Sequence, residues 1–188
     1  MAGAAQSASG STSHIVEPEE LRSLVRQAQR GDALALDELL GILMPYVGRI
    51  CAPIALQEAP DAAQEAAIAI VRNLHQLKAP EALFSWARAI AAREAVRFAT
   101  RAGARNQRTS ASEPADEADL RDLELAADIQ DVLERLPPEQ RAVLTLRHVE
   151  GLDEQSVSNI LSVPIGTVRS RLFRARKGFR AAWGTDRR

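Results

Sequence analysis

The chain has 188 residues, of which 46% are apolar and 26% are charged, and its formal net charge is -1. This balance is typical of one or two small globular domains and excludes a chain that is basic or acidic throughout. Aromatic residues make up only 4%, and no run alternates apolar and polar residues as a half-buried strand does, so we expect an all-α fold.

The start of the chain, residues 1–18, is rich in Ala, Ser, Gly and Thr without apolar periodicity. This composition predicts a disordered leader. The leader has neither a cationic stretch nor a long apolar core, which argues against a secretory signal. No apolar stretch approaches the roughly 18 residues that a membrane span needs. We therefore expect a cytoplasmic protein that does not contact a membrane.

Residues 19–102 have helical periodicity almost throughout. Turn signals occur at Arg30–Asp32 (RGD), at Ala52–Asp61 (APIALQEAPD) and at Lys78–Glu81 (KAPE). These turns divide the segment into roughly four helices, which predicts a first helical domain.

The composition changes again over residues 103–122, which begin with basic residues and continue with Ser, Pro and many acidic residues. Because this stretch has no apolar stripe to bury, we expect a flexible acidic linker. Its acidic residues either keep the linker soluble or repel it from DNA phosphates, and both readings stay open. The helical pattern resumes in shorter pieces over residues 123–184, a second small helical domain, and residues 185–188 form a tail.

A basic helix near the C-terminus, Pro164–Arg180 (PIGTVRSRLFRARKGFR), contains no acidic residue. At helical spacing its apolar stripe holds Val168, Leu172, Ala175 and Phe179, whereas cationic and hydroxyl side chains lie on the opposite face. The sequence therefore predicts a helix that packs with one face and presents the other.

The residues before this helix predict a helix-turn-helix. Asp153 is placed to cap a short helix, Ser162–Pro164 interrupts it, and Pro164 is expected in the first turn of the basic helix. The second helix of such a motif fits the DNA major groove, although a basic face is also compatible with simple solvation. Phe173 lies beside the exposed face, where it either packs or contacts nucleic acid.

The run from Leu133 to Trp183 resembles region 4 of the extracytoplasmic-function (ECF, group 4) RNA polymerase sigma factors of the sigma-70 family. The segments LPPEQRAVLTLRHVEGL and PIGTVRSRLFRAR carry this resemblance. The first domain is similar to sigma region 2 more loosely, through LVRQAQRGDALALDELL, DAAQEAAIAIVRNL and WARAIAAREAVRFATR. The family commonly has Gly where Ser162 stands, and a non-Gly residue in a left-handed conformation there costs roughly 1 kcal/mol.

The resemblance implies a bacterial transcription initiation factor that binds core RNA polymerase and promoter DNA, with no catalytic centre, metal or cofactor of its own. Region 2 (19–102) would bind the polymerase and the minus-10 element, and region 4 (123–184) the minus-35 element. The family commonly has an anti-sigma factor as a further partner, and the sequence leaves its existence open. Matching positions are Asp61, Gln64, Glu65 and Arg72 for core polymerase; Trp86, Arg88, Arg93 and Arg97 for minus-10 DNA; and Thr167, Arg169, Ser170, Arg171, Phe173, Arg174 and Lys177 for minus-35 DNA.

The first domain departs from the family pattern, which usually has Asn at the position of Arg93 and Asp at that of Arg97. With Arg88 and Arg101 these form a cationic ridge, which either contacts promoter phosphates or is a solvated face. Asp61 follows Pro60, so it has a helix cap as its alternative role.

Two other classes of protein would require features that this sequence lacks. A repressor or activator with the same helix-turn-helix would need an effector or dimerisation domain in place of the first domain. A nucleic-acid enzyme would need paired carboxylates at metal spacing, an activated nucleophile or a phosphate loop, and none is recognisable. The single cysteine, Cys51, is expected in the core, and His14, His75 and His148 have no metal-ligand spacing.

Overall fold

The computed structural model describes residues 17–106 and 128–185, and within these ranges it contains helices and no strand. The all-α prediction is confirmed. Three predicted segments lie largely outside the described residues: nearly all of the leader, most of the linker and the end of the tail.

The N-terminal half contains four long helices, as the turn signals predict. They are α1 (Pro18–Gln29), α2 (Ala33–Ala55), α3 (Ala59–Asn73) and α4 (Leu83–Asn106), with short 3₁₀ turns at Leu56–Glu58, Leu74–Gln76 and Pro80–Ala82. The break between α2 and α3 is narrower than the turn signal at Ala52–Asp61, because α2 continues through Pro53.

The RGD turn between α1 and α2 shows why these helices begin and end where they do. Gly31 adopts φ +91°, a conformation that side chains disfavour. The Asp32 carboxylate then accepts the backbone N–H groups of Leu34 at 3.0 Å and Ala35 at 3.1 Å, which caps α2.

The core of this half combines large residues on α2 with small residues on its neighbours. Leu39, Leu43 and Val47 form part of a fully buried stripe along α2. On α3 and α4 the buried positions are mostly alanines, and small side chains let helix backbones approach closely. These buried alanines are Ala62, Ala63 and Ala66 on α3, and Ala87, Ala91, Ala92, Ala95, Ala99 and Ala102 on α4.

One segment, Ala33–Gln76, is long and apolar enough to cross a membrane by length and composition alone. The sequence-based expectation that no apolar stretch approaches that length is therefore wrong. In the structure this segment is two helices separated at Leu56–Glu58, and α2 packs against α1, α3 and α4. Of the most apolar stretch in this segment 39% is buried, so packing in the helical core accounts for part of its hydrophobicity.

The C-terminal half contains shorter helices. Residues 128–134 are helical, and α6 (Pro138–Leu144) continues into a π-helical turn at Thr145–Val149. Then come α7 (Glu154–Leu161) and α8 (Ile165–Thr185). The sequence predicts short helical pieces in this half but not the π turn.

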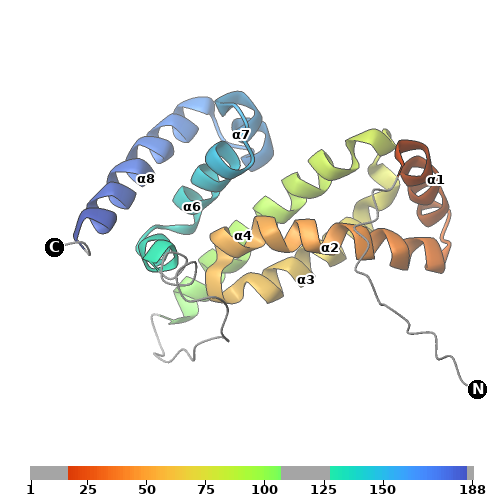
Figure 1. The fold of residues 1–188 in the computed structure, drawn as a ribbon, viewed down its shortest axis with the longest axis horizontal. Coiled ribbons are helices and arrows are strands. Elements are labelled where there is room, and N and C mark those ends of the chain that lie inside the picture. The colour runs from red at the N-terminus through yellow and green to blue at the C-terminus, as the bar shows by residue number, and fades with distance from the viewer. Residues whose placement is uncertain (1–16, 107–127, 186–188) are drawn as a thin grey trace, which may run out of the picture.

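The two halves pack against each other. Helix α6 contacts α2 and α4 as well as α8, and α7 contacts α4. In Figure 1, α1 and α8 lie at opposite ends of the molecule, and α6 lies between α8 and the N-terminal helices. Buried residues of α6, α7 and α8, among them Val143, Val157 and Leu172, belong to the same apolar cluster as the N-terminal core. The C-terminal half is therefore seated on the N-terminal half.

Candidate nucleic-acid interface

Helices α7 and α8 form the helix-turn-helix that the sequence predicts. The Asp153 carboxylate caps α7 by accepting the N–H of Ser156 at 2.7 Å, and this hydrogen bond is the main cause that lowers the pKa of Asp153. Ser162 ends α7 with φ 54° and ψ 44°, the left-handed conformation expected at this position.

The turn itself is fixed by hydrogen bonds between neighbouring residues. The Ser158 hydroxyl donates to the carbonyl of Val163 at 2.6 Å. Pro164 stands directly before α8 rather than within its first turn as predicted, and its carbonyl accepts the N–H groups of Thr167 and Val168. Because proline has no N–H to donate, this position is compatible with it.

The packed face of α8 follows the predicted apolar stripe. Val168, Leu172 and Ala175 are buried, and Phe179 is half-buried and stacks on Trp183 with ring centroids 5.8 Å apart. This burial fixes the rotation of α8 about its axis, and with it the direction of the opposite face.

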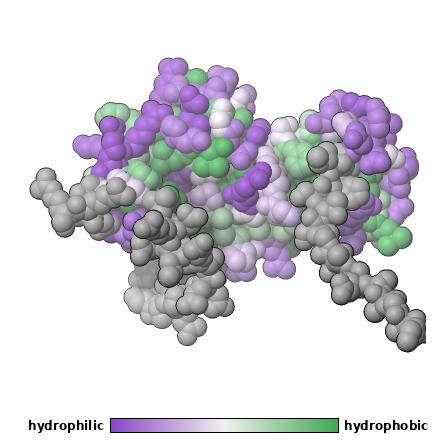
Figure 2. All heavy atoms as spheres, in the orientation of Figure 1, coloured by the Kyte–Doolittle hydropathy of each residue, from purple (hydrophilic) through white to green (hydrophobic). Residues whose placement is uncertain are grey.

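The opposite face of α8 carries the residues predicted to contact the minus-35 element. Five of these side chains are exposed and two, Thr167 and Arg171, are half-buried. Phe173 is 69% exposed, which excludes a role as a core residue in this structure. In Figure 2, hydrophilic residues dominate the outer surface of the half that contains α7 and α8. The exposed members are Arg169, Ser170, Phe173, Arg174 and Lys177.

Two arginines of this face are held by neighbouring groups. Arg174 donates through Nε to the Ser170 carbonyl and through Nη2 to the Ser170 hydroxyl, both at 3.2 Å. Arg169 donates to Glu154 of α7 at 2.7 Å. A phosphate would have to compete with Glu154 for Arg169, whereas Arg174 has no acidic partner to displace among the described residues.

The predicted polymerase-binding residues share one side of α3. Asp61, Gln64 and Arg72 are exposed and Glu65 is half-buried. Asp61 lies in the first turn of α3, and the N-cap position belongs to Glu58, so the alternative that Asp61 is the helix cap is wrong. The spacing of these residues follows the helical repeat, which aligns them into one surface.

The predicted minus-10 residues on α4 do not form a ridge of free cations. Trp86 is half-buried against the core. Arg88 pairs with Glu150 at 3.2 Å, and Arg93 donates to the carbonyl of Ile160 at 3.1 Å. Both partners belong to the C-terminal half, so these cations are engaged within the chain.

Arg97, the fourth predicted minus-10 residue, is exposed and pairs with acidic side chains of the N-terminal half. It lies 2.5 Å from Glu94 on its own helix and 4.0 Å from Glu65 on α3. Such exposed pairs are weak, which leaves Arg97 able to exchange partners.

A largely apolar pocket of about 590 Å³ lies under the C-terminal part of α8, and no sequence signal indicated it. Leu133, Leu144, Val149 and Phe179 contribute apolar walls, and His148 borders it. Burial, together with the nearby charges of Arg176 and Arg147, lowers the pKa of His148. The pocket is separate from the exposed face of α8.

Cys51 is buried, as expected from its apolar context. In the part of the chain that the structure describes, no group of three His, Cys, Asp or Glu side chains is placed to hold a metal ion.

Comparisons with known proteins agree with the helix-turn-helix. The family model for sigma-70 region 4 matches residues 126–177. The RNA polymerase sigma-H factor of Pseudomonas aeruginosa is 31% identical over 187 residues, covering 87% of this chain and 93% of that protein. The ECF RNA polymerase sigma-E factor of Haemophilus influenzae is 31% identical over 179 residues, covering 83% of this chain and 91% of that protein.

Among solved structures, the sigma factor RpoE in complex with the anti-sigma factor NepR from Bartonella quintana has a similar fold. Its TM-score is 0.58 at 21% identity, over 80% of this chain and 98% of that one. The resemblance seen in the sequence is thus confirmed by full-length relatives as well as by the fold. The chain belongs to the ECF sigma factors, the transcription initiation factors that bind bacterial core RNA polymerase and direct it to promoter DNA.

Proposed function

We propose that this sigma factor reads the minus-35 element of its promoters with the exposed face of α8. The observation that carries the proposal is the division of α8 into a buried stripe and an opposite face of cations and hydroxyls. A helix whose rotation is fixed by packing presents the same side chains to the major groove each time it docks. Residues 123–184 thus act as region 4.

Within this face, Arg174 is the residue placed best for base reading. A guanidinium pairs with guanine O6 and N7 through two parallel hydrogen bonds. Its hydrogen bonds to Ser170 keep the side chain along the exposed stripe. Lys177 is exposed farther along α8 and meets phosphate, which carries no sequence information.

A binding-site selection on two variants tests this division. Arg174→Ala should lose about 1–3 kcal/mol of affinity for the preferred sequence and relax the preference at one base pair. Lys177→Ala should weaken binding to all sequences about equally. An Arg174→Ala protein that loses affinity evenly on every sequence would show that this arginine only positions the helix.

The exposed side of α3 is the proposed docking surface for core polymerase, within a region 2 that spans residues 19–102. Asp61, Gln64, Glu65 and Arg72 offer both charges and an amide, and the neighbouring Ile68 is 37% exposed. A mixed surface of this kind suits a specific protein partner.

Replacing Gln64 and Glu65 together by Ala tests the polymerase contact. We expect weaker binding to core polymerase and unchanged binding of the free protein to minus-35 DNA, because α3 and α8 are separate surfaces. Glu38→Ala, on an exposed part of α2, is the control with the same change in net charge. Polymerase affinity equal to that of the control would assign docking to another surface.

The remaining assignments follow from the same organisation. Trp86, Arg88, Arg93 and Arg97 of α4 contact the minus-10 element, and residues 103–122 link the two DNA-binding parts. The protein acts in the cytoplasm, where its polymerase partner is, without a membrane, cofactor or catalytic centre of its own. An anti-sigma factor is a further partner, which the complex formed by the structurally similar RpoE supports.

A further inference from the structure

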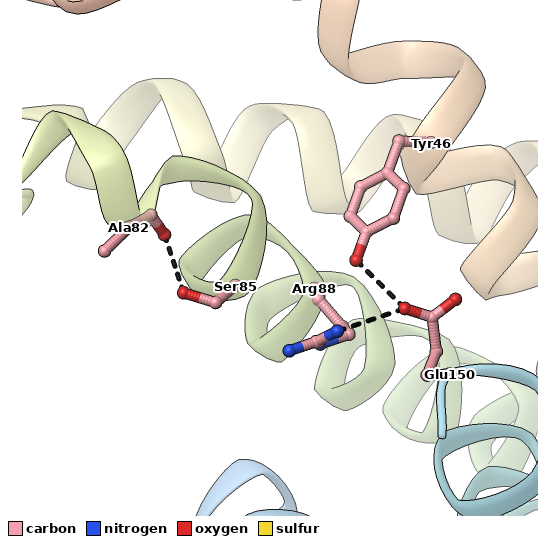
Figure 3. Close-up of polar contacts among 5 residues, drawn as sticks. All are labelled: Tyr46, Ala82, Ser85, Arg88 and Glu150. Atoms are coloured by element: carbon pink, nitrogen blue, oxygen red, sulfur yellow. Dashed lines mark hydrogen bonds and ion pairs between the residues drawn. The ribbon is translucent and has the colours of Figure 1, made fainter. Parts of the chain in front are cut away.

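The two halves of the chain are joined by a cluster of polar contacts centred on Glu150, which directly follows the π-helical turn. Its carboxylate accepts hydrogen bonds from the Tyr46 hydroxyl of α2 at 3.1 Å and from Arg88 of α4 at 3.2 Å (Figure 3). The side chains of Arg88 and Glu150 are only 18% and 10% exposed. Because the pair is largely shielded from water, it is stronger than a surface ion pair.

A second contact lies at the end of α7. Arg93 donates to the carbonyl of Ile160, in the last turn of that helix. The last carbonyls of a helix have no intrahelical donors and carry partial negative charge, so a guanidinium there is favourable. Arg88 and Arg93 therefore both hold the C-terminal half against α4.

These contacts compete with the proposed promoter contacts. A guanidinium that pairs with the shielded carboxylate of Glu150 is not available to a DNA phosphate. Arg93 is exposed, but one of its nitrogens already donates to the end of α7. A groove between the halves is lined by Arg93 and Arg97 of α4 and by Arg171 of α8, so the two DNA-binding surfaces face one space. Docking of the halves thus restricts access to Arg88 on α4, whereas Arg93 and Arg97 stay exposed.

One buried hydrogen-bond donor in the docked arrangement lacks a partner within residues 17–106 and 128–185. Arg88 Nε is buried and has no hydrogen-bond partner among the described residues. A buried donor without a partner costs free energy, whereas in an open chain water or a phosphate would satisfy it. This cost weakens the docked state relative to an open one and makes the docking reversible.

We propose that the free sigma factor is autoinhibited by a closed state, in which Glu150 holds Arg88 and the C-terminal half shields the Arg88 end of the proposed DNA-binding side of α4. Opening breaks the contacts of Glu150 and releases Arg88 and Arg93 to the promoter. The inference rests on the proposed minus-10 role of α4.

The test uses the full chain with Glu150→Gln, which keeps the shape of the side chain and removes its charge. Tyr46→Phe is the second variant, because it removes only the hydroxyl and keeps the edge-to-face contact with Phe84. Glu19→Gln, which breaks the exposed pair with Arg22 on α1, is the control with the same change in net charge.

Two measurements are made on each protein. Small-angle scattering gives the radius of gyration, and fluorescence anisotropy gives the affinity for a short single-stranded oligonucleotide of mixed sequence. Apparent affinity is reduced by the fraction of molecules that are closed, so Glu150→Gln should increase the radius and tighten DNA binding by roughly tenfold. Tyr46→Phe should shift both in the same direction by less.

Equal radius and equal DNA affinity in Glu150→Gln and Glu19→Gln would overturn the closed state. Expansion of Glu150→Gln without a gain in DNA affinity would overturn its inhibitory role. The minus-10 assignment is tested separately by adding Arg93→Ala to Glu150→Gln: unchanged DNA affinity there would refute the role of Arg93 while leaving the closed state standing.

Discussion

Arg141 of α6 is a buried cation on which the ends of two other helices depend. It is 7% exposed and donates from Nε to the carbonyl of Ile54 at 2.7 Å and from Nη1 to that of Leu136 at 2.9 Å. A longer contact reaches the carbonyl of Leu133 at 3.4 Å. Ile54 lies in the last turn of α2 and Leu136 follows the helix at 128–134, positions where carbonyls lack intrahelical donors.

Arg141→Met keeps an apolar chain of similar length and removes every donor. Each buried carbonyl left without a partner costs about 1–3 kcal/mol, and burial of the guanidinium, which also lowers the pKa of Arg141, offsets part of this loss. We expect a net decrease of about 2–4 kcal/mol in the free energy of unfolding. Arg141→Lys keeps the charge but has a single nitrogen, so its decrease should be smaller.

Urea unfolding followed by circular dichroism measures this effect. With a slope of about 2 kcal/mol per molar urea, the midpoint of Arg141→Met should fall by roughly 1–2 M. Arg22→Met, at an exposed position of α1, is the control. If Arg141→Met unfolds at the same urea concentration as Arg22→Met, the carbonyl contacts of Arg141 contribute nothing and the reasoning fails.

Two further predictions concern the turn of the helix-turn-helix and the buried thiol. Ser162→Gly should raise the melting temperature, because it relieves up to about 1 kcal/mol of left-handed strain, whereas Ser162→Ala should not; equal melting of both variants would contradict this. Burial is the main cause that raises the pKa of Cys51 to about 12, so the native thiol should resist a thiol reagent at pH 8 and react on unfolding. Because the folded pKa is above the unfolded one, the contribution of Cys51 to stability is complete below about pH 9 and declines as pH rises towards 12. Urea unfolding of the wild type and of Cys51→Ala at pH 8 and pH 10 measures it, and an unchanged difference between the two proteins would contradict the shift.

The features that the sequence predicts well depend on residues within a few positions of one another. Asp153 caps α7 by bonding to a residue three positions later, and Ser162 ends the same helix. The buried stripe of α8 follows from the helical repeat alone, so the exposed residues opposite Val168 and Leu172 were also identified. The proposed DNA-reading surface is therefore encoded locally.

The contacts between the two halves, in contrast, join residues that lie far apart in the sequence. Glu150 lies 104 residues from Tyr46 and 62 from Arg88, and nothing near either partner in the sequence indicates the pairing. Arg93 and Arg141 bond to backbone carbonyls, which every residue has, so their partners leave no trace in the side-chain pattern. A periodicity argument assigns a cation to an exposed face of its own helix, and it therefore predicted a ridge of free cations on α4, open to phosphate or to solvent.

The contacts of Arg141 and those of Glu150 have different consequences when they are lost. The first affect the free energy of unfolding, and the second affect the opening of the two halves. Arg141 bonds to Leu136 within the C-terminal half, and that bond persists whether or not the halves are docked. Its loss cannot be relieved by opening, so it lowers the stability of the C-terminal half itself. The partners of Glu150 both belong to the N-terminal half, and separation of the halves returns Arg88 to water. The cost of Glu150→Gln is therefore limited to the free energy of opening, and this variant should change the shape of the molecule more than its resistance to urea.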